Sequence, residues 1–483
     1  MPMTNEDSFF FMPVKEVCHR AVVTCSPDIS LIEMARVMMV NNISGIVVAA
    51  DEKPVGIVSL RDLRNLIAEA AETIVSLKVR DVMKTALITI HSSDYLFKAI
   101  FLMAKHNIHR LIVIDEFNML SGVITDADLM RIQTSSPLYL VQEIESAGSI
   151  EQLRLLGQKM TGMVRYALKT NADTQSLIQL IAHFNDALVQ RLIYILDRYH
   201  NVRLPAGAAY LSLGSEGRHE QTLRTDQDSA MVYRDDLSHD DIAAVRRFAG
   251  EISAALENIG VPLCPGNMMA SNPQWCHSLS EWKELIEAWI FHPYPEAMVH
   301  FGVFQDLRVM HGDISFEAEL REYICECARC NSIFFPGMAR NIVRFKTPLG
   351  VFGRLQVEKK GEHRGKLDVK KRGLFALTRG VSLIALEAGF MGGTTWFKLE
   401  RLHHLQVISD HDLEIILNAF TFLLQMRLRT QMNALLSGNS VDNFVDPAEL
   451  TDRERDLLRE AFKGVETLLD ILNCRYQLDL LAQ

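Results

Sequence analysis

Short apolar runs alternate with amphipathic segments over the first 135 residues, and the whole pattern occurs twice. The run Val-Lys-Glu-Val at 14–17 realigns on Val-Arg-Asp-Val at 79–82, an offset of 65 residues. Further along, Gly-Ile-Val-Ser-x-x-Asp at 56–62 matches Gly-Val-Ile-Thr-x-x-Asp at 122–128, so one turn has gained a residue. Each copy, at about 12–72 and 78–135, is predicted to run strand, helix, strand, turn, strand, helix. In the first copy these elements cover 21–24, 31–41, 45–49, 56–59 and 61–70.

The spacing of the apolar residues changes after residue 135. Residues 136–200 have apolar positions at three- and four-residue steps, which predicts a helical connector with a break at 171–173. Residues 201–335 combine buried strands at 208–213 and 228–233 with an amphipathic helix at 238–259, which is typical of an α/β domain. Residues 336–483 are mostly helical, and the amphipathic segments 413–434 and 452–474 predict a helical bundle. Neither segment is apolar throughout, so we expect no membrane span.

Composition and charge narrow the class of protein. The chain has 483 residues, 48% hydrophobic and 23% charged, which predicts a globular protein of about three domains. A net charge of −10 argues against nonspecific binding to nucleic acid. The first 14 residues carry acidic side chains where an export signal needs basic ones, so a cytoplasmic location is expected.

The eight cysteines are scattered, which favours reduced thiols over a disulfide framework. The cluster Cys-Glu-Cys-Ala-Arg-Cys at 325–330 has the close spacing of part of a metal site. It lies in a helical stretch without a second ligand pair, so helical packing is the simpler interpretation.

Residues 213–228, LGSEGRHEQTLRTDQD, carry the candidate chemistry. A Gly-Ser turn follows the first strand, and the polar segment from Glu216 predicts an exposed helix. Backbone N–H groups at such a turn are suited to cradle a triphosphate. Asp226 and Asp228 lie two apart at the start of the next strand, so their side chains project from one face. Two such carboxylates can hold magnesium ions about 3.5–4 Å apart, the geometry of nucleotidyl transfer.

This pattern resembles the signature of the nucleotidyltransferase superfamily, a Gly-Ser turn, a spacer of about ten residues, then Asp-x-Asp. With Gly-Arg at 217–218 and Glu-Gln at 220–221, it is similar to the protein-PII uridylyltransferase branch. The resemblance implies an NTP substrate and an α/β domain with a mixed sheet, followed by a helical substrate-binding domain. It assigns Asp226 and Asp228 to Mg²⁺, Gly214 and Ser215 to the triphosphate, and Arg218 to phosphate charge. It also points to transfer of an NMP group to a hydroxyl, which is a protein tyrosine in those enzymes.

A third carboxylate usually completes such a site from a later strand. Asp306 is the candidate, because the apolar run 303–308 predicts a strand that delivers it. It would act as general base or metal ligand. The structural alternative is a salt bridge from Asp306 to Arg308 or to another cation.

The densest cationic run of this acidic chain lies at 358–371. Lys370 or Lys371, on the first turn of a helix predicted to reach 386, is placed to contact a triphosphate, and Lys370 is the candidate. The alternative is a solvated loop, which is the usual role of a charge run.

The repeated Gly-apolar-apolar-Ser/Thr-x-x-Asp ending resembles a tandem pair of CBS domains, which bind adenine nucleotides between the copies. By this resemblance Ser59 and Asp62 serve one cleft, and Thr125 and Asp128 the other. His109-Arg110 adds a phosphate contact in the second copy, where the first copy has Ser44-Gly45, so the copies are not equivalent. The ligand would be of the AMP, ADP or ATP type, and such pairs commonly form homodimers. Alternatively, Ser59 and Thr125 only cap the following helices, with the aspartates completing capping boxes.

Together these features predict a nucleotidyltransferase regulated by adenine nucleotide, similar to bacterial proteins that join this domain to a CBS pair. The rival is a non-catalytic nucleotide-sensing scaffold, against which the intact carboxylate pair argues. Transfer to a small molecule is a third interpretation, but it would not need a CBS sensor.

Overall fold

The computed structural model describes residues 12–18, 22–50, 53–70, 76–126, 128–129, 137–169, 173–223, 226–350, 353–438 and 441–478. The expected export-signal region before Met12, Thr225 of the candidate motif and the end of the second repeat copy lie outside these ranges. The chain forms two compact units, residues 1–143 and 144–483.

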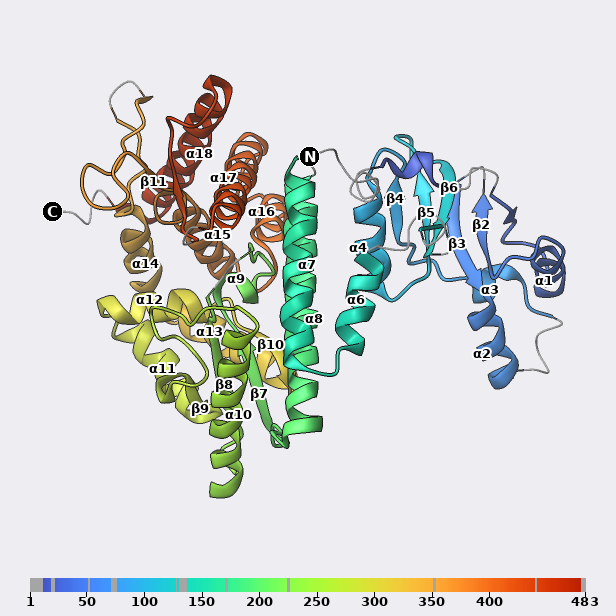
Figure 1. Cartoon of the computed structure of the whole chain (residues 1–483), viewed down its shortest axis with the longest axis horizontal. Coiled ribbons are helices and arrows are strands. Elements are labelled where there is room, and N and C mark those ends of the chain that lie inside the picture. The colour runs from blue at the N-terminus through green and yellow to red at the C-terminus, as the bar shows by residue number, and fades with distance from the viewer. Residues whose placement is uncertain are drawn as a thin grey trace. The chain divides into compact units, whose positions relative to one another are not determined.

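The first unit contains the two repeat copies, each built around a three-stranded sheet (Figure 1). In both copies the first strand pairs parallel with the second, and the second pairs antiparallel with the third. This shared topology confirms the predicted repeat. The first copy contains β1 (Thr24–Cys25), α1 (Leu31–Val40), β2 (Gly45–Ala50), β3 (Lys53–Ser59) and α2 (Leu60–Ala70). The second contains α3 (Val79–Val82), β4 (Thr89–His91), α4 (Leu96–His106), β5 (Arg110–Ile114) and β6 (Leu120–Thr125).

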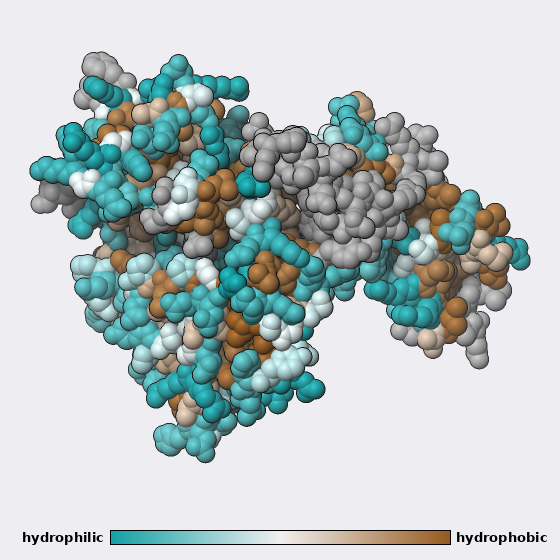
Figure 2. All heavy atoms as spheres, in the orientation of Figure 1, coloured by the Kyte–Doolittle hydropathy of each residue, from teal (hydrophilic) through white to brown (hydrophobic). Residues whose placement is uncertain are grey.

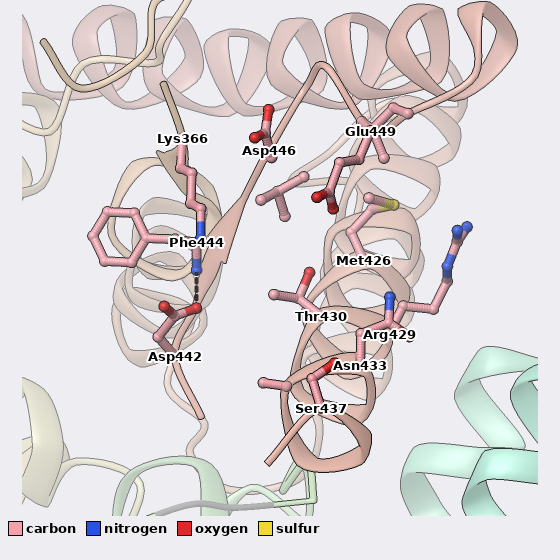
Figure 3. A pocket seen from close by; sticks show the side chains of 13 residues that line it. Lys366, Met426, Arg429, Thr430, Asn433, Ser437, Asp442, Phe444, Asp446 and Glu449 are labelled. Atoms are coloured by element: carbon pink, nitrogen blue, oxygen red, sulfur yellow. Dashed lines mark hydrogen bonds between the residues drawn. The ribbon is translucent and has the colours of Figure 1, made fainter. Parts of the chain in front are cut away.

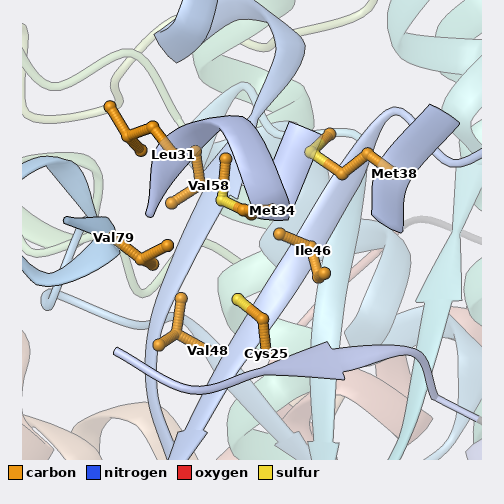
Figure 4. Close-up of a cluster of buried hydrophobic side chains, with 8 residues drawn as sticks. All are labelled: Cys25, Leu31, Met34, Met38, Ile46, Val48, Val58 and Val79. Carbon is orange, nitrogen blue, oxygen red and sulfur yellow. The ribbon is translucent and has the colours of Figure 1, made fainter. Parts of the chain in front are cut away.

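The two copies exchange their opening segments. Val79, which opens the second copy, donates its N–H to Ile29 O (3.1 Å) and is fully buried in the core of the first copy (Figure 4). The equivalent Val14 donates to Asp94 O (2.7 Å) and is likewise fully buried. Each copy therefore needs the other to complete its packing.

The second unit begins with long helices and a mixed sheet. The sheet has the order β10-β7-β8-β9, with β8 and β9 parallel and the other pairs antiparallel, which confirms the predicted α/β fold. Every residue of the central strands β7 and β8 is buried. Helices α8, α10, α11 and α13 pack around this sheet. Helix α6 (Pro137–Ser146) contains the boundary between the two units. The elements after it are α7 (Ile150–Lys169), α8 (Thr174–His200), β7 (Ala208–Ser212), α9 (Gly214–Gly217), β8 (Ser229–Tyr233), α10 (His239–Asn258), β9 (Cys276–Ser278), α11 (Leu279–Phe291), α12 (Pro295–Phe304), β10 (Arg308–Gly312) and α13 (Ser315–Arg329).

The C-terminal part of this unit is the expected helical bundle, in which α17 and α18 pack along each other. A short π-helical turn, η6, leads into α15, and a two-stranded ribbon joins the segment before η6 to the loop after α17. The elements are α14 (Phe334–Val343), β11 (Leu367–Asp368), η6 (Lys370–Leu374), α15 (Phe375–Glu387), α16 (Thr395–His404), α17 (Asp410–Leu436), β12 (Phe444–Val445) and α18 (Asp452–Tyr476).

The segment expected as a connector is part of the second unit. Helices α7 and α8 pack against each other and against α10 and α17. Asp186, from the middle of α8, pairs with Arg308 at the start of β10 (2.9 Å) and with His219 (3.3 Å). The two helices therefore cover one side of this unit, and the partly buried Asp186–Arg308 ion pair joins α8 to the sheet.

Large apolar side chains fill the interior, and on the face shown in Figure 2 hydrophilic residues surround apolar ones that lie singly or in small groups. Within the described ranges, no helix is both long enough and apolar enough to cross a membrane.

Candidate functional site

The turn after β7 brings the chain against the aspartate pair. Leu213 donates its N–H to Asp228 O (2.9 Å), and Gly214 follows with a φ of +53°. A Cβ at position 214 would lie 2.8 Å from Asp228 Oδ2. Glycine is therefore required here both for the left-handed backbone and for the close approach to the carboxylate.

The exposed helix predicted from Glu216 does not form. Instead α9 makes a single turn, Gly214–Gly217, and His219 adopts a φ of +55°, which ends the helix. A Cβ at Gly217 would lie 1.8 Å from the backbone oxygen of Asp306. The turn is short because it is packed against the segment before β10.

Asp226 and Asp228 lie just before β8, which begins one residue later than predicted. The side chain of Gln227, between them, points to the opposite side of the chain. The Gln227 side chain is 1% exposed, and its Nε2 donates to the backbone oxygens of Ser253 and Val261 (both 3.1 Å). This anchor holds the two aspartates on the same side of the chain.

The carboxylate pair has the properties of a cation site. One ligand atom each of Asp226, Asp228 and Cys264 lies within 4.8 Å of the other two. Oδ1 of Asp228 is buried and has no hydrogen-bond partner among the described residues. Burial raises the pKa of Asp228 to about 6, and the charge of Asp226 acts in the same direction. A divalent cation would satisfy the unpartnered oxygen and remove this repulsion.

A cavity of about 510 Å³ opens beside the pair and brings most of the predicted residues together. Gly214, Ser215, Arg218, Asp226, Asp228 and Lys370 all line it. Its other side is largely apolar and comes from α12, α14, α15 and α17. That side includes Met298, Val303, Met338, Ile342, Phe345, Phe375, Phe420 and Leu424.

Cations surround the aspartates inside this cavity. Lys370, on η6 as predicted, places Nζ 3.9 Å from Asp226 Oδ1. Arg379 of α15 and Arg427 of α17 also line the cavity, and neither was predicted from the sequence. Burial lowers the pKa of each guanidinium to about 10, against the opposing charges of Asp306 and Asp226 respectively, so both stay charged near neutral pH. An arginine within an apolar helix run was the signal available in the sequence.

Asp306 is not on a strand, and the predicted strand 303–308 was wrong. Residues 303–304 end α12, β10 begins at Arg308, and Asp306 lies in the turn between them. Its carboxylate is buried and contacts Arg218, Lys398 (3.0 Å) and Arg379 (3.4 Å). Burial alone would raise the pKa of Asp306, but these three cations together hold it well below its usual range. Asp306 therefore forms salt bridges with other cations, as the structural alternative predicted. It does not pair with Arg308, which contacts Asp186.

Arg218 is held by acidic neighbours rather than left free for phosphate. Its Nε donates to Glu220 (2.7 Å) and its Nη1 donates to Asp306. Glu220 also accepts the N–H of Thr395, at the start of α16. Arg218 therefore joins the turn after β7 to the helical bundle while its side chain borders the cavity.

A second cavity of about 260 Å³ lies between α17 and the loop that contains β12 (Figure 3). Figure 3 shows Thr430, Asn433 and Ser437 on its helix side, and Asp442 accepting the N–H of Phe444 (3.0 Å) on the opposite side. Asn443 accepts a hydrogen bond from Arg427 Nε (2.8 Å). This loop therefore also positions a cation of the main cavity.

In the first unit, the predicted ligand residues form the capping contacts of the alternative interpretation. Ser59 Oγ donates to Asp62 Oδ2 (2.5 Å), and Asp62 N–H donates back to Ser59 Oγ (3.3 Å). Thr125 and Asp128 repeat these contacts at 2.6 and 3.3 Å. Asp62 also pairs with Lys84 (2.7 Å). The largely exposed His109 contacts Asp126 (2.8 Å).

The neighbouring Arg110, which was predicted with His109 to contact phosphate, lies at the contact between the two copies. Its Nη2 donates to Ser44 Oγ of the other copy (2.6 Å), and its guanidinium lies where a side chain at Gly45 would stand. The copies differ at these aligned positions, so the arginine of one fills the space left by the glycine of the other.

Comparison with known families matches each part of the chain. Residues 158–296 match the model described as "Putative nucleotidyltransferase DUF294", and residues 332–476 match "Putative nucleotidyltransferase substrate binding domain". Residues 14–69 and 79–135 each match the CBS domain.

Individual relatives match over shorter stretches. "Uncharacterized protein MJ1232" of Methanocaldococcus jannaschii is 36% identical over 119 residues, 25% of this chain and 38% of that protein. "Uncharacterized protein MJ0653" of the same organism is 31% identical over 136 residues, 28% of this chain and 68% of that protein. A crystal structure of the CBS domain pair of protein MJ0100 with 5′-methylthioadenosine and S-adenosyl-L-methionine is 24% identical, with a TM-score of 0.24. That match covers 25% of this chain and 95% of the solved one.

The chain thus spans little more than a third of the length of the first of these relatives. The family models, by contrast, account for both units and follow one another in the predicted order. The chain therefore belongs to the family that joins a pair of CBS domains to the domains described as "Putative nucleotidyltransferase DUF294" and "Putative nucleotidyltransferase substrate binding domain".

Proposed function

We propose that the protein is a divalent-cation-dependent nucleotidyltransferase that uses an NTP. The observation that carries this proposal is the convergence of Asp226 and Asp228 with Lys370, Arg379 and Arg427 around one cavity. Carboxylates beside buried cations suit a triphosphate, because the metal and the cations together neutralise phosphate charge.

Each part of the cavity has a role in this proposal. Asp226 and Asp228 hold the cation, which when bound supplies Lewis-acid polarisation of the phosphate to be attacked. The backbone at Gly214 and Ser215 approaches the triphosphate, since no side chain stands at position 214. Lys370, Arg379 and Arg427 contact phosphate oxygens, and Asp306 keeps Arg218 and Arg379 in place.

The identities proposed for the cation, the transferred group and the acceptor follow from the motif and from the residues that line the cavity. By resemblance to the uridylyltransferases, the cation is Mg²⁺ and the transferred group is UMP. The acceptor is a hydroxyl, a protein tyrosine in those enzymes. The apolar side of the cavity, with Phe345, Phe375 and Phe420, suits a flat ring such as a nucleobase or a tyrosine.

Regulation by the first unit is part of the same proposal. An adenine nucleotide of the AMP, ADP or ATP type would use the Asp62 and Asp128 carboxylates for ribose hydroxyls, and the CBS pair would form a homodimer. A ligand at Asp62 must compete with Lys84. Thermal unfolding with each nucleotide tests this, and a stabilisation that survives Asp62→Ala plus Asp128→Ala would argue against these residues.

The transferase proposal is tested by incubating the full chain with each α-labelled NTP, Mg²⁺ and cell extract. Wild type is compared with Asp226→Asn plus Asp228→Asn, and Asp240→Asn, an exposed aspartate of α10, is the matched control. We expect label to move to an acceptor with wild type and with the control only. Equal labelling by all three proteins, or labelling by none of them, would contradict the transferase proposal and favour the non-catalytic scaffold.

A further inference from the structure

Cys264 is the third ligand-type side chain at the aspartate pair. Its sulfur lies within 4.8 Å of one oxygen each of Asp226 and Asp228. Among the described residues, no other group of three or more His, Cys, Asp or Glu side chains comes together at this spacing.

The chain holds the thiol there by backbone hydrogen bonds on both sides. Gln227 donates its N–H to Pro262 O (3.0 Å), and Ser229 donates to Met268 O (3.1 Å). Between these points the chain turns, with Asn267 N–H donating to Cys264 O (2.9 Å). The segment that carries Cys264 is thus tied to both sides of Asp228, which fixes the thiol relative to the carboxylates.

The Cys264 thiol is a side-chain hydrogen-bond partner of the Asp228 carboxylate, and a second observation points to a bound cation at this contact. Oδ1 of Asp228 is buried and has no hydrogen-bond partner among the described residues. An unsatisfied buried acceptor destabilises the folded state, and more so when it is charged. A cation between the two aspartates and the sulfur would supply the missing partner.

We propose that Cys264 Sγ is the third protein ligand, and that the site therefore prefers a thiophilic divalent cation such as Zn²⁺ or Cd²⁺ to Mg²⁺. When the metal–sulfur bond forms, the thiol proton leaves to solvent, and no oxidant or reductant is needed. Mg²⁺ is bound by oxygen ligands, whereas thiolate ligands select softer cations. This inference replaces the Mg²⁺ that the resemblance implies by a softer cation, and it rests on the proposed function only for the role of the cation in transfer.

The test uses Cd²⁺ as the probe and the full chain carrying Cys330→Ser and Cys474→Ser, which removes the two exposed thiols. Cd²⁺ bound to a thiolate gives an ultraviolet charge-transfer band, so a titration yields both the band and the affinity. We expect Cys264→Ser in this background to abolish the band and to weaken Cd²⁺ binding at least about tenfold. Asp228→Asn should weaken binding by a similar factor. The matched control is Cys276→Ser, another buried cysteine of the same unit, which should change neither readout.

A band and affinity that persist after Cys264→Ser would overturn the proposal. So would displacement of Cd²⁺ by a small excess of Mg²⁺ in the unmodified chain, a measurement that needs no variant to fold. Circular dichroism without metal identifies any variant that loses its structure, and Cys264→Ala then replaces the serine.

The transfer assay, run in parallel, separates the two proposals. A Cys264-dependent band without transfer would leave the metal site and remove the function. Transfer without a Cys264-dependent band would leave the proposed function and remove the proposed metal ligand.

Discussion

Arg218, in the turn after β7, donates a hydrogen bond to Asp306, which lies 88 residues further along the chain. The same carboxylate accepts from Lys398 of α16 and from Arg379 of α15. One buried aspartate thus joins the proposed nucleotide-binding turn to the helical bundle. The position of at least two cavity cations depends on it.

Asp306→Asn should therefore destabilise the second unit strongly. Removing the charge leaves Arg218 and Lys398 buried without a full counter-charge, which typically costs about 3–5 kcal/mol. Urea unfolding measures the loss. Asp236→Asn, which breaks an exposed pair with Arg234, is the control and should cost at most about 1 kcal/mol. Similar losses for both variants would mean that the Asp306 network contributes no more than a surface pair.

Gly217→Ala should distort the turn after β7. The added Cβ would lie 1.8 Å from Asp306 O, so the backbone must move, at a cost of about 1–3 kcal/mol or more. Gly250→Ala is the matched control, because its Cβ meets nothing within 4 Å in helix α10. That variant should stabilise the protein by up to about 1 kcal/mol. Thermal unfolding of both variants checks the pair, and equal effects would contradict the packing described at Gly217.

Lys370→Gln should weaken NTP binding about tenfold, since it removes one charge-assisted contact worth roughly 1.5 kcal/mol. Its neighbour Lys371 is exposed and does not line the cavity, so Lys371→Gln should leave the affinity unchanged. Fluorescence titration with a labelled NTP measures both. An equal loss in the two variants would indicate a diffuse charge effect rather than a contact by Lys370.

Glu216 makes the stability of the second unit depend on pH. Burial raises the pKa of Glu216 to about 8, and the charge of Asp186 acts in the same direction, so the folded chain holds a proton that the unfolded chain releases near pH 4.5. Because the folded state binds more protons, this contribution is complete below pH 4.5 and is lost as pH rises to about 8.

We expect the free energy of unfolding to fall by up to about 1.4 kcal/mol per pH unit across this interval. Glu216→Gln, which keeps the neutral shape, should remove that slope. Urea unfolding at several pH values between 5 and 8 compares the two proteins. The same slope in both would show that Glu216 ionises normally.

Features that depend on a fixed spacing between residues along the chain could be predicted from the sequence. The repeat offset predicted two copies with the same order of elements, and the structure shows the same strand pairing in each. The Gly-Ser turn and the two aspartates are close in the chain and meet in one cavity, as expected. Strand pairing of β7 with β8 is enough to bring them together.

The rest of the site depends on packing between distant segments. The apolar run at 303–308 was assigned to a strand, but a short buried run looks the same whether it ends a helix or forms a strand. Arg379, Arg427 and Cys264 reach the cavity from α15, α17 and a loop, and no motif spacing links them to Asp226. Gly45 and Arg110 likewise meet only because the two repeat copies pack together.

The central claim is that the carboxylate pair directs transfer of a nucleotidyl group, and the most direct test follows two labels on one NTP. The full chain is incubated with metal, acceptor extract and an NTP labelled at the α-phosphate or at the γ-phosphate. Our account predicts that the α-label becomes attached to an acceptor, that the γ-label leaves as pyrophosphate, and that Asp226→Asn plus Asp228→Asn abolishes both. Attachment of the γ-label, or α-label transfer that survives loss of both aspartates, would contradict it.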